Sequence, residues 1–420
     1  MEALPGVYDQ ISYHTLATRI LSGHGFSFDR GWWPATPAGA PTAHWSYLYT
    51  LYLTLVYFVF GANPLAARCI QAIVVGVLHP WLCWRIGNRL FGEPAGLTAA
   101  LLTAVYGYFI YYAGALMTEA FFILAVLWVM DLATLLASRE LEAIAKTRLS
   151  WICLGIALGA SVLLRQVFLL FTPILLAWFL YILRTGDQWK SRKGFASGIL
   201  TAGFAMLLMI LPWSVRNYFV FKQFVLLNNN AGFAFFWGNH PIHGTEFIPV
   251  FRENATYGAL IPEEIRKLDE ASMDHRLLQE GLRFVAQDPQ RYLKLSLSRT
   301  KEYFRFWPSG DSNLAGNLVR FLSFGLYLPF MILGIVVVCV SCLKGQTLIA
   351  TDLKKLPFNG HLLLLLFVVC YTLIHLLTWS LIRYRLPVDG ILILYAAAGV
   401  LWLASSVSAL KATLFKRSAL

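Results

Sequence analysis

Long hydrophobic runs recur along the chain and constrain its fold more than any other feature. A membrane-spanning helix needs about 20 consecutive, mostly apolar residues. Runs of spanning or near-spanning length lie at about 47–60, 66–84, 96–113, 119–136, 151–164, 167–183, 195–213, 318–343, 361–380 and 386–407. Only 13% of the 420 residues are charged, whereas a soluble domain has about 25%. The sequence therefore predicts an all-α polytopic membrane protein.

The hydrophobic runs divide the chain into four parts. We predict an external loop with an amphipathic helix over 1–46, transmembrane helices over 47–213, an external loop with surface helices over 214–317, and C-terminal transmembrane helices over 318–420. The run at 47–60 is short for a span. Two interpretations therefore stay open: this run crosses the membrane, or it is a re-entrant or tilted half-helix that leaves residues 1–46 outside.

The positive charge indicates how the chain is oriented. The net charge is +12, and much of it lies in short loops beside hydrophobic runs, which favours a role in topology over nucleic-acid binding. Basic residues gather in 139–148, 184–193, 344–355 and 411–417. The positive-inside rule places these segments in the cytoplasm. Residues 112–118, Arg165, 214–310 and 383–385 then lie on the opposite side.

Asp9 begins a segment with helical periodicity. The residues that share its apolar face are Tyr13, Leu16, Ala17, Ile20 and Leu21. This spacing predicts a short amphipathic helix with Asp9 in its first turn. A carboxylate there suits the positive end of the helix dipole. On local grounds alone, Asp9 is a helix cap.

Further charged residues stand at the ends of hydrophobic runs on the predicted external side. They are Glu119, Arg165, Arg216, Arg383 and Arg385. Each alone suits a side chain that snorkels to the interface, because a charge at membrane depth costs about 2.5–3.5 kcal/mol. Together they suggest chemistry, since arginine binds phosphate through two hydrogen bonds and a carboxylate can deprotonate a hydroxyl.

Six short stretches, spread over nearly the whole chain, match the landmarks of a known superfamily in order and spacing. They are Asp9 with Tyr13, His44-Trp45-Ser46-Tyr47, Phe60-Gly61 through Ala67-Arg68, Thr118-Glu119, Pro212-Trp213-Ser214-Val215-Arg216-Asn217 with Gly238-Asn239, and Arg383-Tyr384-Arg385-Leu386-Pro387. The chain resembles the GT-C polyprenyl-phosphate-sugar glycosyltransferases, above all the protein O-mannosyltransferases and the lipid A aminoarabinose transferases. The resemblance implies a GT-C-type transmembrane helix bundle with juxtamembrane amphipathic helices in its external loops.

The resemblance also implies an activity and a site. A hexosyl or pentosyl group would move from a dolichyl- or undecaprenyl-phosphate donor to a hydroxyl of a protein, lipid or glycan, with inversion. Asp9 would be the general base, and Glu119 a second acidic residue. The implied substrate-binding residues are Arg383 and Arg385 for the phosphate, then Arg68, Arg165 and Arg216, with Tyr13, His44 and Asn239 in the sugar or acceptor pocket.

Two departures from the family pattern matter. Family members usually have a spanning helix before the Asp loop, so the start of this chain is expected to be truncated or placed late. They often have two acids where this chain has Asp9-Gln10. Because hard cations need several oxygen anions, we predict metal-independent catalysis without a cofactor. The expected location is a bacterial inner or plasma membrane, with the site facing the periplasm or exterior.

Two other classes of protein remain open. A multi-span transporter of a lipid-linked or anionic substrate would also show buried charges and glycine-interrupted helices, such as the one with Gly155 and Gly159. That glycine spacing more often serves close helix packing, and we find no internal repeat of the kind common in transporters. The second alternative is a truncated, inactive transferase homologue.

Overall fold

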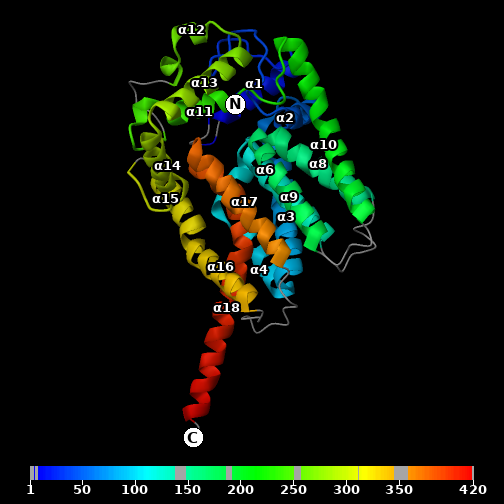
Figure 1. Cartoon of the computed structure of the whole chain (residues 1–420), viewed down its shortest axis with the longest axis vertical. Helices are drawn as coiled ribbons and strands as arrows, with labels where there is room; N and C mark the ends of the chain where they lie inside the picture. Colours follow the sequence, from blue (N-terminus) through cyan, green and yellow to red (C-terminus); the bar gives the residue numbers. More distant parts are fainter. Residues whose placement is uncertain are drawn as a thin grey trace.

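The computed structural model describes Leu4 and residues 8–137, 148–185, 192–249, 257–310, 312–344 and 358–418. Within these ranges the regular elements are helices, and β-structure is limited to isolated bridges at Ser27–Pro41 and Trp32–Thr36. The helices form an elongated bundle (Figure 1) with α1 and α11 to α13 at one end and the C-terminus at the other. The predicted all-α membrane architecture is confirmed.

Seven of the described helices are long and apolar enough to cross a membrane. They are α3 (Pro64–Phe91), α6 (Thr118–Ala137), η2 with α9 (Gln166–Thr185), α10 (Gly194–Phe221 of Arg192–Phe221), α15 with α16 (Leu314–Leu343), α17 (Phe358–Leu377) and η7 with α18 (Ile382–Ser408). A further pair, α4 (Glu93–Ala104) and α5 (Gly107–Gly114), is bent by 54° where we expected one span at 96–113. Residues 105 and 106 break it, so that α5 turns away from α4.

Shorter helices complete the fold. They are α1 (Asp9–Leu21), α2 (Tyr47–Phe60), α8 (Arg148–Leu164), α11 (Ala231–Asn239), α12 (Glu263–Arg266), α13 (Glu270–Gln287) and α14 (Pro289–Tyr303). Helix α1 begins at Asp9 as predicted, and Tyr13, Leu16 and Ala17 on its apolar face are buried. Leu21 was expected on the same face, but it is 40% exposed because α1 ends there.

Helix α2 stays at the α1 end of the bundle. The Tyr57 hydroxyl lies 2.9 Å from Nδ1 of His14 in α1, and the Tyr52 hydroxyl donates to the carbonyl of Ala67 in the first turn of α3. At the other terminus of α2, the Tyr47 hydroxyl donates to Asn217, near the end of α10. Helix α2 has 14 residues, and both of its termini make hydrogen bonds at the α1 end of the bundle. It therefore fits the half-helix interpretation, in which α1 and the start of α3 lie on the same side.

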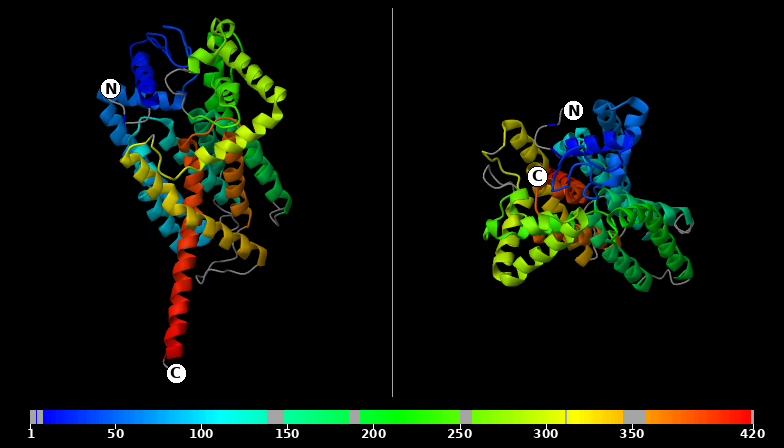
Figure 2. Two further views of the ribbon diagram at one scale, coloured as in Figure 1. Left: turned by 90° about the vertical axis from the view of Figure 1, so that its left-hand side faces the viewer. Right: turned by 90° about the horizontal axis from the view of Figure 1, so that it is seen from above.

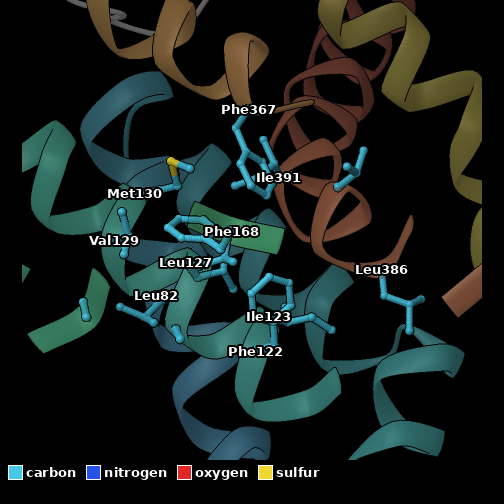
Figure 3. Close-up of a cluster of buried hydrophobic side chains, with 14 of the residues drawn as sticks. Leu82, Phe122, Ile123, Leu127, Val129, Met130, Phe168, Phe367, Leu386 and Ile391 are labelled. Atoms are coloured by element: carbon cyan, nitrogen blue, oxygen red, sulfur yellow. The ribbon is translucent and has the colours of Figure 1, made fainter. Parts of the chain in front are cut away.

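Helices α6 and α18 form the centre of the bundle. Figure 3 shows Phe122, Ile123 and Leu127 of α6 packed near Phe367 and Ile391, and all five side chains are buried. The lateral contacts in a membrane bundle rely on close packing, because lipid is as apolar as a protein interior. A Cβ added at Gly155 of α8 would collide with the Ala202 carbonyl of α10, so the predicted packing role of that glycine is confirmed.

Helices α11, α13 and α14 lie together beside α1 at the same end of the molecule (Figure 2), and we call these three helices the cover. Glu270, in the first turn of α13, is buried and joins this cover to the N-terminal loop. Its carboxylate accepts hydrogen bonds from the Thr36 hydroxyl at 2.8 Å and the Ala43 N–H at 2.7 Å. Both contacts join residues more than 200 positions apart in the sequence. They hold the N-terminal loop in place, which has little secondary structure of its own.

Helix α14 differs from our expectation of a helix lying on the membrane surface. Its residues Leu295, Ser296, Arg299 and Tyr303 are buried in the protein. Arg299 donates to the carbonyls of Leu376 and Gly238 and to Oδ1 of Asn239. These acceptors lie in the last turns of α17 and α11, whose dipoles place partial negative charge there. The face of α14 that carries these apolar and basic residues therefore packs on α11 and α17.

Candidate active site

Four charged side chains from separate segments meet at the α1 end of the bundle. Nη1 of Arg383 in η7 (Ile382–Arg385) lies 2.9 Å from Oδ2 of Asp9, and its Nε lies 3.6 Å from Oε1 of Glu119. Arg165 pairs with the same Glu119 oxygen. We call Asp9, Glu119, Arg165 and Arg383 the Asp9 cluster. Its members come from α1, α6, the start of η2, and η7, so folding assembles what the sequence keeps far apart.

The cluster has a more open end and a closed end. The Asp9 side chain is 34% exposed and the Arg383 side chain 20%, whereas Glu119 is only 2% exposed. Two carboxylates and two guanidinium groups balance in charge, as buried ionic groups must. Solvent therefore reaches the cluster mainly at its Asp9 end, whereas Glu119 holds both arginines from the closed end.

Local backbone structure explains how these side chains are presented. Glu119 stands in the first turn of α6, where the helix dipole favours a carboxylate. Arg165 interrupts the helical run between α8 and η2 with an extended backbone (φ −147°, ψ 108°). Its side chain therefore does not lie along a helix surface, and its Nε donates a hydrogen bond to the Thr118 hydroxyl at 3.1 Å.

Tyrosines line the cluster. The ring centroid of Tyr384 lies 5.2 Å from the guanidinium carbon of Arg165 and 5.4 Å from that of Arg383, within the range of cation–π attraction. Tyr13 lies one turn after Asp9 and packs edge-on against Trp45 and Tyr49. Burial, and then the charge of Asp9, raise the pKa of Tyr13. Its hydroxyl stays protonated at neutral pH and can donate a hydrogen bond.

Gln10 follows Asp9, where the resemblance to the GT-C transferases led us to expect a second acid. Its side chain is fully buried, and Oε1 accepts hydrogen bonds from the Leu116 N–H at 3.1 Å and from Arg68 at 3.4 Å. Gln10 therefore ties α1 to α3 and to the segment just before Glu119. Arg68, predicted to bind substrate, is held beside the cluster by this amide.

Arg385 and Arg216 are not brought into the cluster. Arg385 is fully buried, with Nε 2.9 Å from Oδ1 of Asp389 and Nη1 donating to the Tyr303 carbonyl at 2.6 Å. Arg216 donates to the Thr42 carbonyl, the Tyr47 hydroxyl and Oδ1 of Asn217. These contacts hold both arginines against other parts of the fold, so neither belongs to the Asp9 cluster.

His44 and Asn239 lie in the contact between the N-terminal loop and the cover. Nδ1 of His44 is 2.8 Å from the Asn229 carbonyl oxygen, and burial lowers the pKa of His44. Asn239 is fully buried and donates to the Phe235 carbonyl while accepting from Arg299. Among the described residues, no hydrogen bond joins His44 or Asn239 to the Asp9 cluster, so both remain predicted pocket residues only.

Asp131 of α6 is an ionic residue that our sequence reasoning did not select. It is 1% exposed and pairs with Arg85 at 3.0 Å and Arg89 at 2.9 Å in α3. It follows Glu119 by 12 residues in one helix, about 18 Å at 1.5 Å per residue. The sequence signal for this ion pair was an acidic residue, Asp131, inside an apolar run, together with two arginines in another apolar run. The distance places this group outside the candidate site.

The helix bundle is similar in fold to solved membrane transferases. One is the archaeal oligosaccharyltransferase AglB from Archaeoglobus fulgidus in complex with an inhibitory peptide and a dolichol-phosphate, with a TM-score of 0.58 and 17% identity over 98% of this chain and 48% of that chain. Another is ArnT from Cupriavidus metallidurans bound to undecaprenyl phosphate, with a TM-score of 0.41 and 13% identity over 97% and 75% of the two chains. This chain therefore spans about half the length of AglB.

The family comparison is more specific. Residues 45–215 match the model of the dolichyl-phosphate-mannose-protein mannosyltransferase family. Together with the fold, this match confirms the resemblance to the GT-C glycosyltransferases. Glu119 and Arg165 lie inside the matched segment, whereas Asp9 and Arg383 lie outside it. No curated protein sequence matches the chain significantly.

Proposed function

We propose that this protein is a membrane glycosyltransferase that moves a sugar from a polyprenyl-phosphate donor to a hydroxyl acceptor, with Asp9 as general base. The observation that carries the proposal is the ion pair between Asp9 and Arg383 at the open end of the cluster. It joins a candidate base to a candidate phosphate ligand. The dolichol-phosphate bound by AglB and the description of the matched family support a lipid-phosphate donor.

The donor phosphate and Asp9 compete for one guanidinium group. Arginine forms charge-assisted hydrogen bonds with carboxylate and phosphate alike. In the structure described here Arg383 is bonded to Asp9. When the phosphate of the donor takes Arg383, Asp9 loses this partner. Donor binding therefore frees an oxygen of Asp9 to accept a hydrogen bond from the acceptor hydroxyl, as a general base must.

The transfer step follows from this arrangement. The acceptor oxygen attacks the anomeric carbon and forms the new C–O bond, and its proton passes to an Asp9 carboxylate oxygen. The bond between the anomeric carbon and the phosphate oxygen breaks, and the phosphate keeps the electron pair. Attack from the face opposite the leaving phosphate inverts the anomeric carbon. Arg383 and Arg165 stabilise the charge on the departing phosphate.

Glu119 has a separate role in this scheme. It is nearly inaccessible and contacts both arginines, so we assign it as their counter-ion, which keeps them oriented when the donor leaves. Arg383 also stands between the two carboxylates, and together with Arg165 it balances their charge. We therefore propose metal-independent transfer, which predicts that EDTA leaves the rate unchanged.

The decisive experiment is a transfer assay with purified protein in lipid nanodiscs and dolichyl- or undecaprenyl-phosphate sugars. Asp9→Asn should lower transfer by about 100- to 10,000-fold, the usual contribution of a general base. Asp29→Asn is the matched control, because Asp29 is exposed in the loop that follows α1. Unchanged transfer by Asp9→Asn would overturn the assignment of the base. No transfer by the unmodified protein with any such donor would overturn the function and favour a transporter.

We also propose that the Asp9 cluster faces the periplasm or exterior. Helix α8 runs from Arg148 to the residue before Arg165, and α9 returns to Arg184. The basic ends of these helices therefore lie away from the cluster, as the positive-inside rule requires. A green fluorescent protein fused to the C-terminus should fluoresce in a bacterial host, and alkaline phosphatase at the same place should be inactive. The reverse result would invert the orientation.

A further inference from the structure

His375 lies in the last turn of α17, just before the segment that carries Arg383. Three of its contacts are with that segment. Its Nδ1 lies 3.1 Å from the Trp379 carbonyl oxygen, and its own carbonyl accepts a hydrogen bond from the Ser380 hydroxyl at 3.2 Å. Its ring stacks on Tyr384 with a centroid distance of 4.8 Å and an interplanar angle of 27°. One residue thus contacts the segment from 379 to 384 at three points.

Tyr384 lies between His375 and the two arginines. Its ring lies near the guanidinium groups of both Arg165 and Arg383. The imidazole of His375, the phenol of Tyr384 and the two guanidinium groups are therefore in continuous contact. This chain of contacts ends at the groups that we propose bind the donor phosphate.

The other sides of the imidazole are enclosed. His375 is 7% exposed, and its ring contacts Tyr371 at a centroid distance of 4.7 Å and Tyr303 at 6.2 Å. Because a carbonyl only accepts, Nδ1 must carry the proton that bonds to Trp379. Nε2 has no hydrogen-bond partner within the part of the chain that the structure describes. His375 therefore holds the segment from 379 to 384 through two features, the face of its ring and its Nδ1.

The segment needs such support because its own secondary structure is weak. Arg383 sits in the four-residue 3₁₀ helix η7, which follows Leu381 in an extended conformation (φ −137°, ψ 154°). A single 3₁₀ turn has few internal hydrogen bonds and poorer bond geometry than an α-helix. Contacts from outside therefore decide where the Arg383 guanidinium group points.

We propose that His375 is a positioning residue that orients Arg383 and Arg165 for the donor phosphate, acting through Tyr384 and the Trp379 carbonyl. This inference rests on the proposed function and adds a residue that touches neither substrate. Phosphate binding by arginine depends on orientation, because both N–H groups must point at phosphate oxygens. A small displacement of Arg383 should therefore weaken donor binding while leaving the acceptor side unaffected.

The experiment measures binding of undecaprenyl phosphate and the KM of donor and acceptor for the protein in nanodiscs. His375→Ala should raise the donor KM and the Kd for undecaprenyl phosphate by about 10- to 100-fold, as expected for displaced groups. His375→Phe keeps the ring without the Nδ1 donor, and His375→Asn keeps a donor without the ring. Each should fall between the alanine variant and the unmodified protein.

His361→Phe is the matched control. His361 is also a buried histidine of α17, 2% exposed, but it packs on Phe91 and Tyr395 in the first turn of the helix. It precedes His375 by 14 residues, about 21 Å along the helix at 1.5 Å per residue. This variant should keep the donor KM of the unmodified protein.

The outcomes separate this inference from the proposed function. An unchanged donor KM in folded His375→Ala, or an equal rise in donor and acceptor KM, would overturn the positioning role. If His375→Ala does not fold, the Phe and Asn variants decide: an unchanged donor KM in both overturns the inference, and a raised one supports it. Failure of the unmodified protein to bind undecaprenyl phosphate would overturn the proposed function instead.

Discussion

Arg383 and Arg385 are two residues apart in the same short helix and have opposite surroundings. Arg383 is 20% exposed and shares two carboxylates, Asp9 and Glu119, that come from distant helices. Arg385 and its partner Asp389 are both completely buried, one turn apart in the sequence. The Tyr106 hydroxyl also donates to Asp389 at 2.8 Å. The first ion pair can exchange partners with a substrate, whereas the second is sealed.

The comparison shows that residue type and motif position do not decide the role of an arginine here. A 3₁₀ helix has 3 residues per turn, so positions two apart point about 120° from each other around the axis. One side chain therefore enters the cluster and the other enters the core against Phe324, whose ring centroid is 3.5 Å from the Arg385 guanidinium carbon. Three predictions test this distinction, and a fourth concerns the cover.

The largest expected effect concerns the sealed pair. Asp389→Asn should destabilise the protein by about 3–5 kcal/mol, because it leaves the Arg385 charge buried without its counter-ion. The double variant with Arg385→Met should recover most of that loss, since a buried ion pair can often be replaced by apolar groups. Thermal unfolding in one detergent, followed by size-exclusion chromatography, measures both. Full stability of the single variant would show that the pair is not structural.

The next effect concerns the open pair. Arg383→Ala should lower transfer by about 100-fold, similar to the loss of one preorganised donor to a developing anion. It should also raise the Kd for undecaprenyl phosphate while leaving the unfolding temperature nearly unchanged. Transfer assays and unfolding scans on the same preparation make the comparison with Asp389→Asn direct. Wild-type transfer by a folded Arg383→Ala protein would contradict the assignment.

A smaller effect tests competition for Arg383. Asp9→Asn removes the negative charge that holds Arg383, so undecaprenyl phosphate should bind about 5-fold more tightly, which corresponds to about 1 kcal/mol for a partly exposed ion pair. The same variant should be inactive in transfer. Opposite changes in binding and transfer distinguish loss of the base from loss of the fold. Weaker binding would show that Asp9 does not compete with the phosphate.

The last effect lies in the cover, away from the cluster. Burial raises the pKa of Asp274 in α13 to about 7, with a further contribution from the charge of Glu270. The folded state therefore binds this proton more strongly than the unfolded state. Its contribution to stability is present at about pH 4, falls as the pH rises toward 7, and is lost above it.

Asp274→Asn tests this pH dependence. The asparagine keeps an oxygen that can accept from the Phe233 N–H, as Oδ1 of Asp274 does at 3.1 Å, but it does not titrate. The variant should unfold at a higher temperature than the unmodified protein at pH 8, and the difference should be smaller at pH 5. Thermal unfolding at both pH values measures the difference. Equal shifts at pH 5 and pH 8 would contradict the raised pKa.

Periodicity and hydropathy predicted much of the fold because they are local properties. The start of α1 at Asp9 and the close packing at Gly155 were both readable from the sequence. Contacts between distant segments were not. The burial of the α14 face depends on the last turns of α11 and α17, to which Arg299 donates. An apolar and basic face looks the same in sequence whether it meets lipid headgroups or the carbonyl ends of other helices.

The candidate site was predicted only in part for the same reason. The sequence selected Asp9, Glu119, Arg165 and Arg383, which the structure brings together. It also selected Arg385 and Arg216, which the fold uses internally. It did not select His375, because a lone histidine in an apolar run gives no sign of what it stacks on.

By itself, the sequence determined that this chain is a helical membrane protein with charges at span ends and GT-C-like motifs in order. Those features follow from the cost of placing charge in lipid, which acts on each segment separately. Tertiary structure alone decided which charges pair. Two carboxylates and two arginines from four segments meet in one cluster, while a fifth charge two residues from Arg383 pairs inside the core. Pairing depends on direction in space, and direction is fixed only when the helices pack.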